Sequence, residues 1–286
     1  MSDQNLSDPQ EVPLETQFVP GNPVIAIDCA GAGEVLLFVH GIGGNRTNWR
    51  EQLEFFAPRF RSVAMDVRGW GLSEDYDGAL DFDDVTDDIA RVLTHLGATS
   101  CHLVGLSMGG LIAQHVLWRR PDIIRSAVFA DTSVGPGEEH DAQWIEDFLR
   151  LRKAPLLAGK TPADIAPNVA RSLMAPNAPE SSCRRLTESI AALHKESYLK
   201  ALDYVSNYKR KLDHAQVRVP VHAMVGEFDQ LTPVACAQSL AARFGSCRMD
   251  VVPGGGHLSN MDNAQAFNEL LDNFLSAQLV GRGVKA

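Results

Sequence analysis

One five-residue segment constrains the fold of this chain more than any other part of the sequence. Gly105-Leu-Ser107-Met-Gly109 lies directly between an apolar run, residues 101–106, and an apolar helical pattern that begins at Gly110 and is ended by Pro121. A serine between two glycines at such a junction predicts a tight strand-to-helix turn with strained backbone angles and an exposed hydroxyl. The segment therefore predicts a buried strand, a following helix and a candidate nucleophile, Ser107.

Similar apolar runs and helical patterns alternate along most of the chain. The expected strands are residues 34–40, 62–67, 101–106, 126–130, 221–225 and 248–252, with 16–20 and 24–29 as an antiparallel pair at one edge. The expected helices are residues 49–57, 82–96, 110–120, 233–244 and 260–275. Runs rich in Val, Leu and Phe fit strands buried on both faces, and the alternation favours right-handed crossovers. The sequence therefore predicts an α/β fold with a mostly parallel, doubly wound sheet.

Residues 135–213 break this alternation because they contain no convincing buried strand. The region is predicted to be helical and irregular, and five prolines are expected to interrupt its helices: Pro155, Pro162, Pro167, Pro176 and Pro179. It has 12 Lys and Arg against 11 Asp and Glu, so its net charge is +1, whereas the rest of the chain has −11. We expect it to form an inserted helical lid, with residues 1–134 and 214–286 as the α/β core.

Two further loops supply candidate partners for Ser107, because a serine hydroxyl needs a base to become a good nucleophile. His257 follows the last expected strand and a run of three glycines, which predicts a flexible loop at the carboxyl edge of the sheet. Asp229 follows the preceding strand, and the order Ser, Asp, His along the chain matches a known hydrolase arrangement. Asp131, at the end of an earlier strand, is the alternative acid that would orient the base, and Glu227 is a weaker rival.

Acyl transfer also needs hydrogen-bond donors for the oxyanion. One expected donor is the backbone amide of Met108, the residue after the candidate nucleophile, and the other is the amide of Ile42 in a glycine-rich segment. His40, two residues earlier, is expected to hydrogen-bond this loop rather than to act as a base. Arg68 belongs to a second turn, Asp66–Ser73, which is expected to be structural, with Arg68 as a weak candidate for binding a substrate carboxylate.

Composition and charge disfavour several other classes of function. The net charge of −10 argues against binding to nucleic acid, since the phosphate backbone would repel the protein. No apolar stretch approaches the roughly 20 residues needed to span a bilayer. The polar, acidic segment Met1–Gln10 does not resemble a signal peptide, so we expect a cytoplasmic protein that acts on a small molecule and has no membrane partner. The five cysteines include no C-x-x-C pair, which argues against a disulfide framework and a zinc site.

Together these motifs resemble the α/β-hydrolase superfamily over nearly the whole chain. Within it, the segments His257–Asn260, Gly226–Pro233 and Ala130–Thr132 look most similar to the 3-oxoadipate enol-lactonase group. The resemblance implies a cofactor-independent serine hydrolase that opens a small anionic enol-lactone through an acyl-serine intermediate. The residues that it assigns to the catalytic triad are Ser107, Asp229 and His257.

The sequence leaves several alternatives open. The same triad would suit amide hydrolysis, C–C bond hydrolysis or cofactor-free oxygenation, and a ligand-binding receptor would keep the fold with little turnover. His40 is commoner in esterases, C–C bond hydrolases and amidases than in enol-lactonases. The arginines of the expected lid suit a small, carboxylate-bearing substrate, and the candidate contacts are Arg150, Arg152 and Arg171, with Arg184 and Arg185 nearby in sequence. Nothing in the sequence predicts the oligomeric state.

Overall fold

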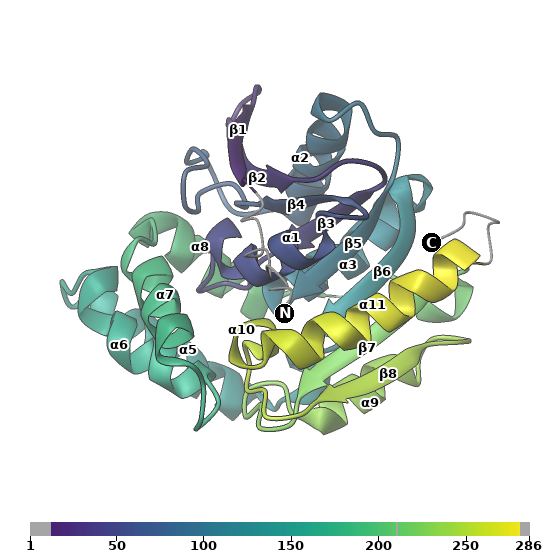
Figure 1. Ribbon diagram of the computed structural model, residues 1–286. Coiled ribbons are helices and arrows are strands. Elements are labelled where there is room, and N and C mark those ends of the chain that lie inside the picture. The colour runs from purple at the N-terminus through teal and green to yellow at the C-terminus, as the bar shows by residue number, and fades with distance from the viewer. Residues whose placement is uncertain (1–12, 210, 281–286) are drawn as a thin grey trace, which may run out of the picture.

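A central eight-stranded sheet organises the protein. The computed structural model describes residues 13–209 and 211–280 (Figure 1), so the Met1–Gln10 segment considered above lies outside the described residues. The strands lie in the order β1-β2-β4-β3-β5-β6-β7-β8. Their bounds are β1 (Glu15–Val19), β2 (Ile25–Ala30), β3 (Val35–Val39), β4 (Arg61–Met65), β5 (Cys101–Leu106), β6 (Ile124–Ala130), β7 (Val221–Gly226) and β8 (Arg248–Val252).

The direction of the strands confirms the predicted α/β class. Among these eight strands, β2 alone runs against the others, since it pairs antiparallel with β1 and β4 while the remaining neighbours pair parallel. The expected edge pair is present, with Glu15 opposite Cys29. Every residue of β3, β5 and β7 is buried, because helices cover both faces of the sheet, and this explains their uninterrupted apolar runs.

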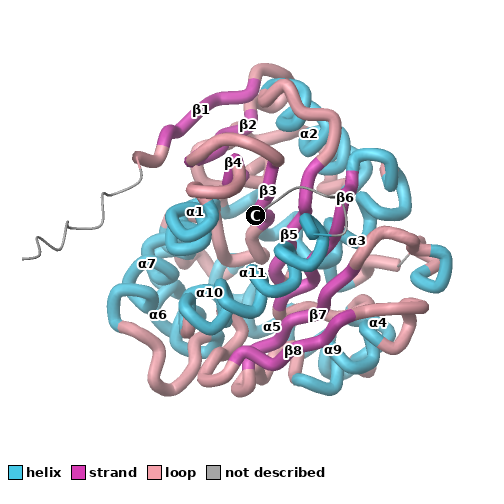
Figure 2. Tube along the Cα trace, turned by 45° about the vertical axis from the view of Figure 1, so that its right-hand side comes forward, coloured by secondary structure: helices cyan, strands magenta, loops and turns pink. Residues whose placement is uncertain are grey.

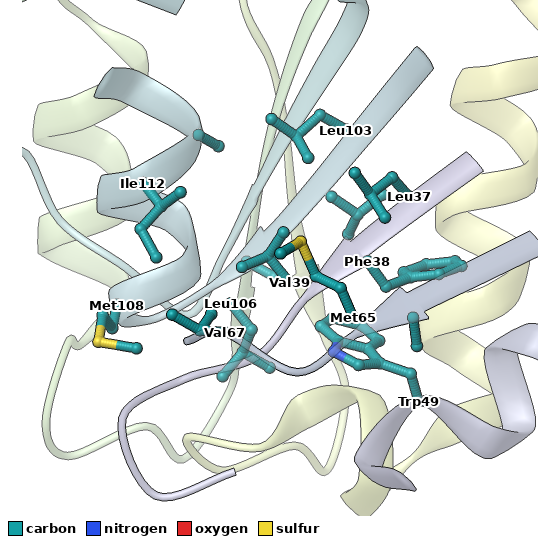
Figure 3. Packing of buried hydrophobic residues seen from close by; sticks show 14 of the residues in the cluster. Leu37, Phe38, Val39, Trp49, Met65, Val67, Leu103, Leu106, Met108 and Ile112 are labelled. Atoms are coloured by element: carbon teal, nitrogen blue, oxygen red, sulfur yellow. The ribbon is translucent and has the colours of Figure 1, made fainter. Parts of the chain in front are cut away.

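Helices cover both faces of the sheet (Figure 1). One face carries α1 (Arg50–Phe56) and α11 (Ala264–Val280), and the other carries α2 (Phe82–His95), α3 (Met108–Arg119) and α9 (Val234–Ala241). Figure 3 shows the resulting core, in which Leu37, Val39 and Leu103 of the sheet lie between Ile112 of α3 and Trp49.

Two expected helices are interrupted. The one expected over residues 49–57 begins as a short 3₁₀ helix, η1 (Arg46–Trp49). The one expected over residues 260–275 is two helices, α10 (Ser259–Asp262) and α11, because Asn263 between them has a non-helical φ of −138°.

The described chain between β6 and β7 forms a short 3₁₀ helix, η3 (His214–Gln216), and five α-helices, which we call the cover helices. They are α4 (Pro136–Glu139), α5 (Ala142–Leu157), α6 (Pro162–Leu173), α7 (Glu180–Ala191) and α8 (Lys195–Ser206). Figure 2 shows this part of the described chain as helices and loops, and Figure 1 shows the helices gathered at one end of the sheet. The prediction of a helical, strand-free region is therefore confirmed for the residues described.

No helix within residues 13–209 and 211–280 is both long and apolar enough to cross a membrane.

Two of the five prolines do not break helices as predicted. Pro155 lies inside α5 and Pro167 inside α6. A proline leaves the carbonyl four residues earlier without its helical donor. Those carbonyls belong to Leu151 and Ala163, both exposed, so water can replace the missing donor and the helices continue.

Candidate active site

Ser107 occupies a strained turn at the carboxyl end of β5, as its flanking glycines predict. Its φ of +56° lies in the left-handed region, and α3 begins at the next residue. A Cβ on Gly105 would lie 2.1 Å from the carbonyl oxygen of Gly109, and a Cβ on Gly109 would lie 2.2 Å from that of Val39. Both positions therefore exclude any larger side chain. The strand, the turn and the helix pack too tightly for anything but glycine on either side of the serine.

The structure brings Ser107, His257 and Asp229 into one hydrogen-bonded chain. The Ser107 hydroxyl lies 2.9 Å from His257 Nε2, and His257 Nδ1 lies 2.9 Å from Asp229 Oδ2. Because a carboxylate only accepts, Nδ1 carries the proton and Nε2 is left to accept from the serine. These three residues come from loops after β5, β7 and β8, which end at the same edge of the sheet. This geometry suits a nucleophile, a base and an orienting acid.

The surroundings of Asp229 keep it charged beside the imidazole. It accepts from the amides of Leu231 and Thr232 at 2.8 and 3.0 Å, and from the Thr232 hydroxyl at 2.8 Å. Burial works to raise the pKa of Asp229, but the charge and hydrogen bond of His257 and the donors of Thr232 outweigh it and lower the pKa. Burial likewise works to lower the pKa of His257, but Asp229 outweighs it and raises that pKa.

The glycines before His257 serve close packing rather than the flexibility that the sequence suggested. A Cβ on Gly256 would lie 2.6 Å from the amide nitrogen of Ala175, and one on Gly226 would lie 2.1 Å from the carbonyl oxygen of Gly256. The His257 amide also donates to the carbonyl of Leu173 at 2.8 Å. The loop that carries the base is therefore held between β7 and the end of α6.

Asp131, the alternative acid, makes other bonds. Its carboxylate accepts from the Gly226 amide at 2.8 Å and from the amide and hydroxyl of Ser259 at 3.1 and 2.6 Å. These donors favour the charged form, but burial and then the charge of Asp229 outweigh them and raise the pKa of Asp131 to about 8. The residue ties the end of β6 to β7 and to the loop after His257, while Asp229 contacts the imidazole.

The two expected oxyanion donors face the same space as Ser107. Ile42 and Ser107 line both chambers of the cavity described below, and Met108 lines one of them. Neither the Ile42 nor the Met108 amide donates a hydrogen bond to any described residue. The Ile42 carbonyl accepts from Trp70 Nε1 at 3.0 Å. Buried His40 also fixes the loop, because its Nε2 accepts from the Val67 amide at 3.1 Å while Nδ1 donates to the carbonyl of Gly41. The amides of Ile42 and Met108 are thus fixed in position, and neither donates a hydrogen bond to a described residue.

The cavity at Ser107 has two chambers. The first, which we call the His257 chamber, encloses about 420 Å³ of empty space, part of it open to solvent. Its lining includes His257, Leu258, Phe148, Arg152, Leu173 and Tyr198. The second, which we call the Trp144 chamber, encloses about 590 Å³ measured in the same way, and its lining includes Met108, Leu111, Thr132, His140, Trp144 and Val205. Ile42, Ser107, Phe148 and Leu231 line both. Ser107 therefore lies where the two chambers meet.

Only one of the predicted substrate contacts lies in this cavity. Arg152 lines the His257 chamber. Arg150 is exposed and pairs with Asp147, and Arg171 is exposed and lines neither chamber. Arg68 is buried elsewhere, where it forms ion pairs with Asp84 and Asp88; its hydrogen bonds are used by these carboxylates, so the expectation that it meets substrate is not supported.

Several cavity residues were not anticipated from sequence. Phe148 and Trp144 lie on α5 one and two turns before Arg152, and Tyr198 reaches the His257 chamber from α8. The spacing of His140, Trp144, Phe148 and Arg152 at intervals of four residues was the available signal, because such residues share one face of a helix. No comparable pattern marks Tyr198.

Comparison with known proteins shows the family to which the chain belongs. A family model described as alpha/beta hydrolase fold matches residues 34–264, and the chain belongs to that family. It is 26% identical over 255 residues to 3-oxoadipate enol-lactonase 2 of Acinetobacter baylyi, covering 87% of this chain and 92% of that protein. It is 30% identical over 253 residues to a putative carbamate hydrolase RutD of Caulobacter segnis, covering 85% and 91%. The solved enol-lactonase from Burkholderia xenovorans LB400 shares the fold, with a TM-score of 0.76 at 20% identity over 92% of this chain and 100% of that one.

Proposed function

We propose that this protein is a cofactor-independent serine hydrolase that cleaves an ester or lactone through an acyl-Ser107 intermediate. The observation that carries the proposal is the hydrogen-bonded chain from Ser107 through His257 to Asp229, beside two unused amides in one cavity. Membership of a hydrolase family supports the reaction class, and the lactonase name of one relative supports the bond type.

In the first half-reaction, the Ser107 oxygen attacks the substrate carbonyl carbon while its proton passes to His257 Nε2. The carbonyl oxygen becomes an oxyanion, and the amides of Ile42 and Met108 stabilise its charge; each such donor contributes about 3 kcal/mol of the barrier reduction. The bond between the carbonyl carbon and the leaving oxygen then breaks. His257 gives its proton to that oxygen, and the acyl group stays on Ser107.

In the second half-reaction, water attacks the acyl carbon and gives a proton to His257. The second tetrahedral intermediate uses the same two amides, and its collapse returns the proton to Ser107 and releases the acid. Asp229 stabilises the imidazolium in both halves and fixes the tautomer in which Nε2 faces the serine. Asp131 acts in this proposal as a structural carboxylate.

The proposal also assigns roles to the two parts of the chain. Residues 1–134 and 214–286 form the core that carries the triad, and residues 135–213 form a lid that selects the substrate. The lining of the cavity supports this, because most of its apolar wall comes from the cover helices. The small, carboxylate-bearing substrate expected from sequence has one supporting contact, Arg152. A cytoplasmic location and the lack of a nucleic-acid partner stay predictions from composition.

A second reaction, hydrolysis of an amide or carbamate, is favoured by one observation: the RutD relative is named as a putative carbamate hydrolase. Initial rates on p-nitrophenyl acetate, a γ-lactone and p-nitroacetanilide distinguish the two reactions. We expect ester and lactone turnover that Ser107→Ala abolishes, and no oxygen consumption. Faster turnover of the anilide would favour amide hydrolysis. Undiminished turnover by Ser107→Ala, or turnover that needs oxygen, would overturn the proposal, and binding without turnover would favour a receptor.

A further inference from the structure

The two chambers on either side of Ser107 differ in charge, and the difference assigns a polarity to the substrate. We propose that the leaving group of the substrate carries a single carboxylate, bound by Arg152 and Tyr198 in the His257 chamber, while an uncharged acyl group occupies the Trp144 chamber. This inference rests on the proposed function, because it assigns the two sides of the bond that Ser107 would attack.

The position of His257 decides which chamber takes the leaving group. The imidazole Nε2 that takes the serine proton must then protonate the leaving oxygen, so that oxygen has to lie within hydrogen-bonding reach of it. His257 lines the chamber that contains Arg152 and does not line the Trp144 chamber. The leaving group therefore extends toward Arg152, and the acyl group extends the other way.

Arg152 carries a positive charge without a carboxylate to balance it. Within residues 13–209 and 211–280 its guanidinium has no ion pair or hydrogen bond, whereas Arg150 on the same helix pairs with Asp147 at 2.8 Å. Burial lowers the pKa of Arg152, which means that its charge is poorly solvated. An anion in the chamber would replace the lost hydration with charge-assisted hydrogen bonds.

A stack of side chains along α5 fixes the direction of the guanidinium. Its central carbon lies 4.3 Å from the ring centre of Phe148. The Phe148 ring stacks on Trp144 with 5.3 Å between centroids, and Trp144 stacks on His140 with 3.6 Å. Cation–π contact and stacking restrain these side chains, so Arg152 is preorganised beside the chamber.

Tyr198 supplies a second donor in the same chamber. Tyr198 is 2% exposed, and no hydrogen bond joins its hydroxyl to another described residue. Burial raises the pKa of Tyr198, so the hydroxyl keeps its proton and can donate it. One guanidinium and one neutral hydroxyl suit a monoanionic carboxylate better than a dianionic phosphate, because no other Lys or Arg among the described residues lines the chamber.

The Trp144 chamber has the opposite character. None of the residues that line it in the described chain is Asp, Glu, Lys or Arg. Its one titratable group is His140, and burial lowers the pKa of that residue, which keeps it neutral at pH 7. A charged acyl group would lose its hydration there without gaining a partner.

Three esters of similar size test the assignment. Acetoxyacetate carries its carboxylate on the alcohol side, monomethyl malonate is its isomer with the carboxylate on the acyl side, and ethyl acetate is neutral. After division by each ester's hydroxide-catalysed rate, we expect wild-type kcat/KM for acetoxyacetate to exceed that for monomethyl malonate by at least tenfold. The reverse order would overturn the inference.

Variants then test whether the preference for acetoxyacetate depends on Arg152 and Tyr198. We expect Arg152→Leu to lower kcat/KM for acetoxyacetate by about 10- to 100-fold, chiefly through KM, and ethyl acetate by less than threefold. Arg152→Lys should restore part of the loss, Tyr198→Phe should lose less than Arg152→Leu, and the exposed Arg150→Leu should change neither ester. Equal losses on both esters would reduce Arg152 to a structural role and overturn the inference. If this inference alone is wrong, Ser107-dependent turnover of p-nitrophenyl acetate remains. If that turnover is absent, the proposed function is wrong as well.

Discussion

The floor and the roof of the cavity are built from different interactions. The floor consists of the strand-end loops that carry Ser107, Asp229 and His257, and each polar side chain there is held by hydrogen bonds to backbone or to its neighbours. The roof consists of the cover helices, whose cavity-facing side chains are mostly apolar, with Arg152 and Tyr198 as unpaired donors. The floor is thus fixed for one reaction, whereas the roof leaves its polar groups for a ligand.

The difference separates chemistry from selection. Changing the floor should alter the chemical step for every substrate, because in the proposed mechanism the triad and the oxyanion donors act on the reacting bond itself. Changing the roof should alter which substrates are used, because these side chains contact parts of the substrate that do not react. The following variants would break or sharpen this comparison.

The largest effect is expected for Ser107→Ala. The substitution removes the nucleophile, so kcat should fall by about 10⁴-fold or more on every ester. The fold should survive, because alanine carries the same Cβ as serine at this φ of +56° and the substitution removes only the hydroxyl oxygen. Stopped-flow rates measure kcat, and thermal melting shows whether the fold survives. Activity within tenfold of wild type would mean that the floor does not act through this residue.

The two buried aspartates of the floor should behave differently. Asp229→Asn disturbs the tautomer of His257, so we expect kcat to fall by about 10³- to 10⁴-fold with little change in stability. Asp131→Asn leaves the Ser259 donors mismatched, so we expect a loss of about 1–3 kcal/mol in the free energy of unfolding and less than a tenfold loss in kcat. The reverse pattern in urea unfolding and initial rates would make Asp131 the acid of the triad.

A roof variant should change selectivity without changing chemistry. Trp144→Leu removes the ring that faces the acyl side, so kcat/KM for a benzoate ester should fall about tenfold, while the value for an acetate ester changes by less than threefold. Trp118→Leu is the matched control, because Trp118 lies on α3, lines neither chamber and is 42% exposed. Equal losses on both esters would show that the roof also supports the reacting groups.

The smallest expected effect is on pH dependence. His257 must be neutral to accept the serine proton, and its pKa is raised by Asp229, so kcat/KM should fall on the acid side with a midpoint above the ordinary histidine value of about 6.5. The charge of Arg152 works to lower the pKa of His257. Arg152→Leu should therefore move the midpoint upward. An unchanged midpoint would mean that Arg152 does not act on the imidazole, and a downward shift would contradict the sign of its effect.

The floor of the cavity could be predicted from the sequence because short, local patterns determine it. Glycines at positions 105 and 109 predict the serine turn by steric exclusion alone, and parallel strands bring Asp229 and His257 to the same edge. The tight packing of the His257 loop could not be predicted from the sequence, because it depends on Ala175, a residue more than 80 positions away in the chain.

The roof of the cavity was harder to predict from the sequence, because it depends on how each cover helix is rotated about its own axis. Arg150 and Arg152 lie two positions apart, which turns their side chains by about 200° around α5. One faces solvent and the other the cavity, and the sequence offers no way to choose between them. The same limit applies to Tyr198, whose role depends on how α8 packs against α5.

The most direct test of the account is to capture the acyl-enzyme. Wild-type protein is mixed with p-nitrophenyl acetate, quenched in acid within milliseconds to seconds, and measured by intact and peptide mass spectrometry. We expect a burst of p-nitrophenol and a mass increase of one acetyl group on the peptide that contains Ser107, with neither in Ser107→Ala. Turnover with no acyl group on Ser107, or with the label on another residue, would contradict the account.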